Sequence, residues 1–172
     1  MKHFLKRTGA YFVDCTLCYV FVMLVIQWAL LGNIRDSIGI SNEWFETSIN
    51  LQIYVLLTIS LPVWLYFIYF DSKKSTGTYG KRLFKIKVSD IMGDGLGFGK
   101  STARTFAKLL PWELAHFGLI FPTPIYFETD PNIRLLTILA LVLLISYAVS
   151  IIINSKGQSM YDKLLGTRVV DK

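Results

Sequence analysis

Three long uncharged runs constrain this chain more than any other feature. Residues 15–34, 47–70 and 135–153 contain no Asp, Glu, Lys or Arg. A helix of about 20 apolar residues matches the ~30 Å hydrocarbon core of a bilayer. The remaining sequence is too short for two large domains, and the mean hydropathy of +0.47 is high for a soluble protein. We therefore expect one membrane domain over residues 1–172.

Asp14 lies immediately before the first uncharged run, inside the first span expected over residues 8–34. An ionisable group within a membrane helix costs about 2.5 to 3.5 kcal/mol near the bilayer centre unless it has a partner or water. Arg7 lies about 10 Å away along a helix axis, too far to contact Asp14, and is expected to reach outward to lipid phosphates. Asp14 is therefore expected to be either an ion or proton site or a structural carboxylate held by another segment.

Basic residues predict the orientation of the chain. They cluster in the first seven residues, in the loop 71–105 and in the tail 154–172, whereas the loop 33–47 is acidic. Lys and Arg are enriched in cytoplasmic loops. Both termini are therefore expected to be cytoplasmic, which requires an even number of crossings.

The segment 106–127 decides that number. It is mostly apolar but contains Pro111, Pro122 and Pro124. With the last span at 133–153, a crossing here places the acidic link 128–132 outside. We therefore predict an all-α, four-helix transmembrane bundle whose third span is broken by prolines. A re-entrant or surface-lying helix is the alternative for this segment.

The two halves of the chain show a faint internal repeat. Residues 7–10 resemble 104–107, and residues 81–88 resemble 162–169. Strict alternation over 85–88 favours a short strand with a basic face. We expect the two strands to meet as a small cytoplasmic β element, bringing Lys81 and Asp162 near the mouths of spans one and three.

Three motifs carry a resemblance to a known family. They are residues 7–14, residues 78–88 and residues 158–170. Together they resemble the RDD family of bacterial integral membrane proteins, which is named for one arginine and two aspartates. The resemblance assigns Arg7 and Asp14, and Asp162 in preference to Asp90 as the second aspartate. It implies a multi-pass protein of the bacterial inner membrane.

Two functions are compatible with these residues. Some members of the family are implicated in exchanging sodium, lithium or potassium for protons, so the resemblance implies a monovalent cation/proton exchanger, expected to work as a homo-oligomer. Its ion or proton site would be formed by Arg7, Asp14 and Asp162, with secondary candidates Lys81, Arg82, Arg104, Glu113 and His116. Tyr161 stands where the family usually has histidine, which removes a titratable imidazole.

The alternative is a non-transporting scaffold, assembly factor or lipid-interacting component with structural Arg and Asp residues. Lys85 and Lys87 would then contact anionic lipid headgroups. Cys15 and Cys18 are read as small core residues. The sequence contains no recognisable nucleophile–base pair or metal-ligand spacing, so we expect neither an enzyme nor a cofactor, and no binding to nucleic acid.

Overall fold

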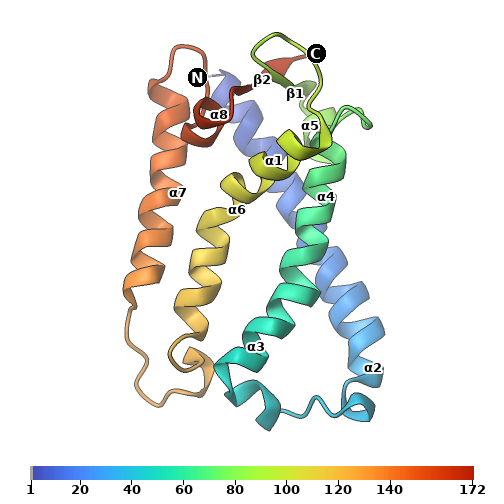
Figure 1. Ribbon diagram of the computed structural model, residues 1–172, viewed down its shortest axis with the longest axis vertical. Coiled ribbons are helices and arrows are strands. Elements are labelled where there is room, and N and C mark those ends of the chain that lie inside the picture. The colour runs from blue at the N-terminus through green and yellow to red at the C-terminus, as the bar shows by residue number, and fades with distance from the viewer. Residues whose placement is uncertain (1) are drawn as a thin grey trace.

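The computed structural model describes residues 2–172, most of which are helical. Within these residues four long helical stretches run side by side (Figure 1). The first stretch is α1 (Lys2–Val20), which continues through a π-helical segment, η1 (Phe21–Leu31), into α2 (Gly32–Ile34); the second is α3 (Ser48–Val55), η4 (Leu56–Ser60) and α4 (Leu61–Asp71); the others are α6 (Phe98–Ile120) and α7 (Leu135–Ile153). The connecting loops contain the 3-10 turns η2 (Asp36–Ile38), η3 (Glu43–Glu46) and η5 (Ile125–Phe127).

Three of these stretches are long and apolar enough to cross a membrane. They are His3–Ile34, Ser48–Asp71 and Leu135–Ile153. Each contains one of the three uncharged runs, so those predictions are confirmed as helices. Many large apolar side chains on them are exposed, as expected of surfaces that face lipid.

The prediction for the third segment was wrong in detail. α6 begins at Phe98 rather than 106, runs through Pro111 without a break and ends at Ile120. A proline inside a helix removes one backbone hydrogen bond, and α6 tolerates this loss while packing against α4 and α7. Phe121, the residue after α6, has an extended backbone. Pro122 follows it, and a proline disfavours the helical conformation of the residue before it.

α6 and α7 approach each other closely at Gly118. A Cβ atom at this position would lie 2.6 Å from the Thr137 hydroxyl and 2.8 Å from the Thr137 backbone nitrogen. The side-chain-free position therefore allows the two helices to pack tightly. Further along, the Tyr147 hydroxyl of α7 donates to the Ala107 carbonyl of α6 at 2.7 Å.

A small cap closes one end of the helices, next to both termini (Figure 1). It contains two short helices, α5 (Tyr79–Leu83) and α8 (Met160–Leu164), each followed by a strand, β1 (Ile86–Asp90) and β2 (Thr167–Asp171). The strands pair antiparallel, with Val88 opposite Val169. The predicted meeting of the two strands is confirmed.

The register of this pair agrees with the internal repeat. Aligning residues 81–88 with 162–169 makes Val88 and Val169 equivalent, and these two residues form the centre of the five-residue ladder. A twofold axis through that pair would exchange the two strands. Each half of the chain also has the same order of two long helical stretches, a short helix and a strand.

The cap is fixed to α1 by packing. Ile86, Val88, Leu96 and Val169 form a buried cluster with Ala10 of α1. A Cβ atom at Gly80 would lie only 2.0 Å from the Ala10 carbonyl oxygen, so this position of α5 accepts only glycine. A second cluster of Cys18, Phe67 and Leu109 joins α1, α4 and α6 just below. α1 therefore packs against the cap and also against α4 and α6.

Candidate functional site

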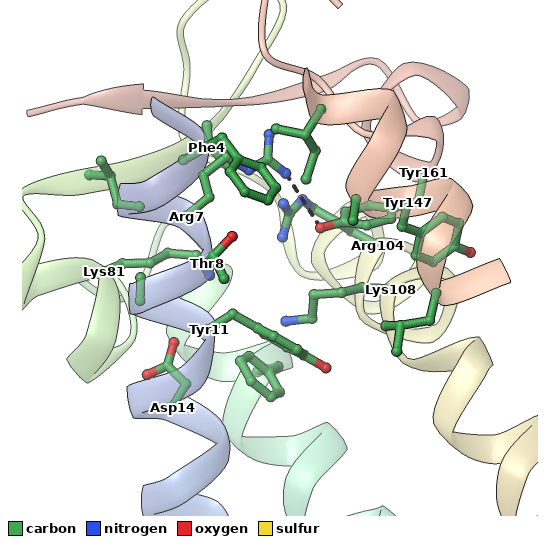
Figure 2. Close-up of a pocket in the computed structure, with 17 residues that line it drawn as sticks. Phe4, Arg7, Thr8, Tyr11, Asp14, Lys81, Arg104, Lys108, Tyr147 and Tyr161 are labelled. Carbon is green, nitrogen blue, oxygen red and sulfur yellow. Dashed lines mark hydrogen bonds between the residues drawn. The ribbon is translucent and has the colours of Figure 1, made fainter. Parts of the chain in front are cut away.

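Seven charged side chains gather where the helices meet the cap, and we call them the charge cluster. Each is no more than 8 % exposed. They come from α1, α4, α5, α6 and α8, and five of them line one cavity (Figure 2). The members are Arg7, Asp14, Asp71, Lys81, Arg104, Lys108 and Asp162.

Asp162 is held by two arginines. Arg7 Nη2 donates to Asp162 Oδ2 at 2.5 Å, and Arg104 donates to Asp162 Oδ1 from Nε at 3.1 Å and Nη2 at 2.9 Å. Arg7 also donates to the Gly157 carbonyl. The expectation that Arg7 reaches outward to lipid phosphates was therefore wrong, because a buried carboxylate of the cap binds it instead.

Asp162 also starts its own helix. Ser159 caps α8 by accepting a hydrogen bond from the Asp162 backbone, while the Asp162 carboxylate accepts one from the Ser159 backbone. Burial alone would raise the pKa of Asp162, but Arg104 and Arg7 hold that pKa well below its usual range. Asp162 is therefore ionised in the folded protein.

Asp71 is the centre of a second group of ion pairs. Lys81 donates to Asp71 Oδ1, and Arg104 Nη1 donates to Asp71 Oδ2 at 2.9 Å. Arg104 thus bridges Asp71 of α4 and Asp162 of α8. Sequence reasoning treated Asp71 only as the end of a span. Its place directly after a 24-residue uncharged run, mirroring Asp14 directly before one, is a signal that could have found it.

Asp14 is satisfied without a cation. Its carboxylate accepts hydrogen bonds from the Tyr66 hydroxyl at 2.7 Å, the Thr78 hydroxyl at 2.6 Å and the Gly80 backbone N–H at 2.8 Å. Thr78 is also the N-cap of α5, so the carboxylate reaches the start of that helix. Asp14, which is 1 % exposed, thereby joins α1 to α4 and α5.

Lys108 was missed by sequence reasoning and has an unusual environment. Its ammonium lies 3.2 Å from the centre of the Phe67 ring and 3.7 Å from Asp71 Oδ2, which is too long for a hydrogen bond. Among the side chains and backbone groups that the structure describes, it has no hydrogen-bond partner. The spacing Arg104 to Lys108 places both on one helix face, and that spacing is the available sequence signal.

The remaining candidates lie outside the charge cluster. Arg82 donates to the Gly77 carbonyl and stabilises the loop before α5. Lys85 and Lys87 are exposed at β1. Glu113 accepts hydrogen bonds from Ser60 and Trp64. His116 Nδ1 lies 3.9 Å from Glu113 Oε2.

The described part of the chain contains no group of three or more His, Cys, Asp or Glu side chains placed to hold a metal ion. The chemistry of the charge cluster is instead that of paired Arg, Lys and Asp groups in a buried environment. Such pairs hold segments together and disfavour any rearrangement that would leave one charge alone.

Fold and cluster together define a small helical protein of the membrane type, in which buried Arg–Asp pairs join a cap to long apolar helices. A sequence model of the RDD family matches residues 1–171. The chain belongs to the RDD family. No curated protein and no solved structure matches it.

Proposed function

We propose that this chain is a four-span membrane protein that does not transport ions, a scaffold whose rigid cytoplasmic cap offers a basic surface to anionic lipids or an acidic partner. One observation carries the proposal: the carboxylates of Asp14, Asp71 and Asp162 are each bound by donors from other segments. Buried carboxylates that are each paired in this way are suited to holding a structure together.

The fourth crossing is supported by the depth of α6. Ala107 of α6 is bonded to Tyr147 of α7, and Gly118 lies against Thr137, so α6 and α7 run antiparallel at the same level. α7 is a candidate membrane span in its own right. This pairing supports a crossing by α6 alongside α7, with the charged side chains Arg104 and Lys108 of α6 buried inside the protein.

The orientation follows from charge. The cap end carries the basic loop and both termini, while the loops at the opposite end contain Glu43, Glu46 and Glu128. By the positive-inside rule the cap faces the cytoplasm. The resemblance to bacterial members of the family supports the inner membrane as the location that we propose.

The exchanger alternative is less well supported by this geometry. A cation that binds Asp14 must replace three hydrogen-bond donors at once. It must also enter a cluster whose four cations, Arg7, Lys81, Arg104 and Lys108, already outnumber its three carboxylates. These positive surroundings disfavour the entry of a further cation.

The scaffold leaves a basic face available. Lys85 and Lys87 are exposed at the start of β1 and form no part of the buried pairs. Each basic residue near an anionic membrane surface contributes about 1 kcal/mol of attraction. Either anionic headgroups or an acidic cytosolic partner would meet this face.

A transport assay tests the proposal. Purified protein is reconstituted into sealed vesicles with an acidic interior, and a pH-sensitive dye follows proton release after sodium or potassium is added outside. We expect wild type and Asp14→Asn to match protein-free vesicles. Cation-driven release by wild type that Asp14→Asn abolishes, with the variant still folded, would overturn the scaffold proposal in favour of exchange.

A further inference from the structure

A cavity of about 230 Å³ lies beneath the cap, with walls from α1, α6 and α7 (Figure 2). Charged members of the cluster from α1, α5 and α6 line it, whereas α7 contributes the apolar side chains Leu144, Ala148 and Ile151. The lining therefore combines buried charges with apolar surface.

Lys108 lines this cavity and lacks a hydrogen bond to the residues that the structure describes, although Asp71 Oδ2 lies 3.7 Å from its ammonium and the Phe67 ring lies beside it. Its ammonium projects from α6 into the space between Tyr11 and Arg104 (Figure 2). The side chain is 7 % exposed, and no hydrogen bond to any residue in the range 2–172 satisfies its nitrogen. An ammonium has three N–H donors, and burying it without acceptors is costly. An oxygen-bearing anion in the cavity would supply those acceptors.

The charge of the cluster also calls for one anion. Four cations face three carboxylates, so the seven side chains carry a net charge of +1. Arg7, Lys81 and Arg104 already donate to Asp162 or Asp71, whereas Lys108 does not. The Thr8 hydroxyl lines the same cavity. A singly charged phosphate group would neutralise the cluster without displacing an existing pair.

We propose that this cavity binds a phosphate group carrying one negative charge, with Lys108 as its principal donor. The phosphate belongs to a phospholipid headgroup or is free in solution. The apolar side chains of α7 favour the lipid, because Leu144 lines the cavity and, at 40 % exposed, also belongs to the apolar outer surface that acyl chains would cover. This site goes beyond the proposed function, and its test does not depend on the transport assay.

The test compares lipid binding by wild type and two matched variants. Full-length protein in mild detergent is titrated with phosphatidylglycerol, phosphatidylcholine or inorganic phosphate, and binding is followed by native mass spectrometry and thermal stabilisation. Lys108→Met removes the ammonium and keeps an unbranched side chain that is one atom shorter. Lys87→Met is the control, because Lys87 is an exposed lysine of β1 outside the cavity.

We expect phosphatidylglycerol to bind wild type and Lys87→Met equally, and Lys108→Met at least tenfold more weakly. Phosphatidylcholine should bind all three weakly, because its choline ammonium cancels the charge of its phosphate and is repelled by a cluster of net charge +1. Saturable stabilisation by inorganic phosphate that requires Lys108 would assign the site to free phosphate. The proposal would be overturned if Lys108→Met changed the binding of neither phosphatidylglycerol nor inorganic phosphate. Loss of lipid binding in Lys87→Met alone would also overturn it.

Folding of the variant is checked separately. Without added anion, Lys108→Met should melt at or above the temperature of wild type, because it removes a buried ammonium with no hydrogen bond to any described residue, while Asp71 keeps its hydrogen bonds from Lys81 and Arg104. Should the variant not fold, wild type alone decides. Phosphatidylglycerol with a photoactivatable group should cross-link to cavity-lining residues such as Tyr11 and Ala148, and cross-links confined to other surfaces would contradict the proposal.

Discussion

Asp14 and Asp162 are the same residue type in two adjoining regions of the molecule, both buried, but the two regions hold them differently. Asp162 is paired with two guanidinium groups, from Arg7 and Arg104. Asp14 is held by two hydroxyls and one backbone N–H. The first region joins α1 and α6 to α8, and the second joins α1 to α4 and α5.

The difference matters because the two kinds of partner respond differently when the carboxylate is lost. A guanidinium stays charged at any ordinary pH and cannot adapt to a neutral neighbour. A hydroxyl can rotate and become an acceptor. α1 contributes Arg7 to one region and Asp14 to the other, so it depends on both kinds of contact to hold the cap.

The largest effect is expected from Arg104→Met. Arg104 bridges Asp71 and Asp162, so its removal leaves two buried carboxylates with fewer partners. Breaking a buried ion pair from one side costs about 3–5 kcal/mol. Thermal melting in detergent should show a large loss of stability, with Arg104→Lys in between because an ammonium lacks the fork that reaches both carboxylates. A melt equal to wild type would contradict the bridging role.

The next comparison sets Asp162→Asn against Asp14→Asn. Asp162→Asn leaves the buried Arg7 guanidinium beside a neutral amide and should lower the free energy of unfolding by about 3–5 kcal/mol. Asp14→Asn keeps acceptors for Tyr66 and Gly80 and lets the Thr78 hydroxyl reverse, so it should cost about 1–3 kcal/mol. Both are measured by melting under identical conditions. Equal losses would show that the two regions do not differ in kind.

A smaller effect is expected from Tyr66→Phe. This change removes one of the three hydrogen-bond donors to Asp14. It also removes the acceptor for the Tyr79 backbone N–H, but that hydrogen bond is exposed to solvent. Losing one such hydrogen bond costs about 1 kcal/mol. Denaturation should show a modest loss, with Tyr69→Phe as a control because Tyr69 is an exposed tyrosine of the same helix. Equal effects of the two changes would argue against the Asp14 contact.

The smallest effect near neutral pH concerns acid sensitivity. Arg104 and Arg7 lower the pKa of Asp162 in the folded protein despite its burial. As the pH falls, the Asp162 carboxylate is therefore protonated at a higher pH in the unfolded chain than in the folded protein. The stability difference between wild type and Asp162→Asn should be constant above about pH 5 and shrink below about pH 4. Melting temperatures measured across this range check it. A difference that grows on acidification would contradict the assigned pairing.

The sequence was sufficient for the features that depend on local pattern. Long uncharged runs predicted the apolar helices, and the alternation at residues 85–88 with its echo at 162–169 predicted two strands that meet. The proline positions misled the prediction for α6, because Pro111 is tolerated where a helix packs on two neighbours. Composition alone does not reveal such packing.

The charge cluster was only partly predictable. Arg7, Asp14 and Asp162 stood out as motif residues, whereas Asp71 and Lys108 did not. Near the end of a span, the sequence pattern of an Asp or Lys is the same whether the side chain lies at the lipid surface or inside the protein. Which of them turns inward depends on segments that arrive from elsewhere in the chain.

The amino-acid sequence by itself determined which stretches form apolar helices, because hydrophobic length and periodicity act over neighbouring residues. Only the tertiary structure decided where the charges go. Arg7 and Asp162 are 155 residues apart, and Asp14 and Gly80 are 66 apart. A buried charge is stable only beside its partner, and packing of α1 against the cap creates that proximity.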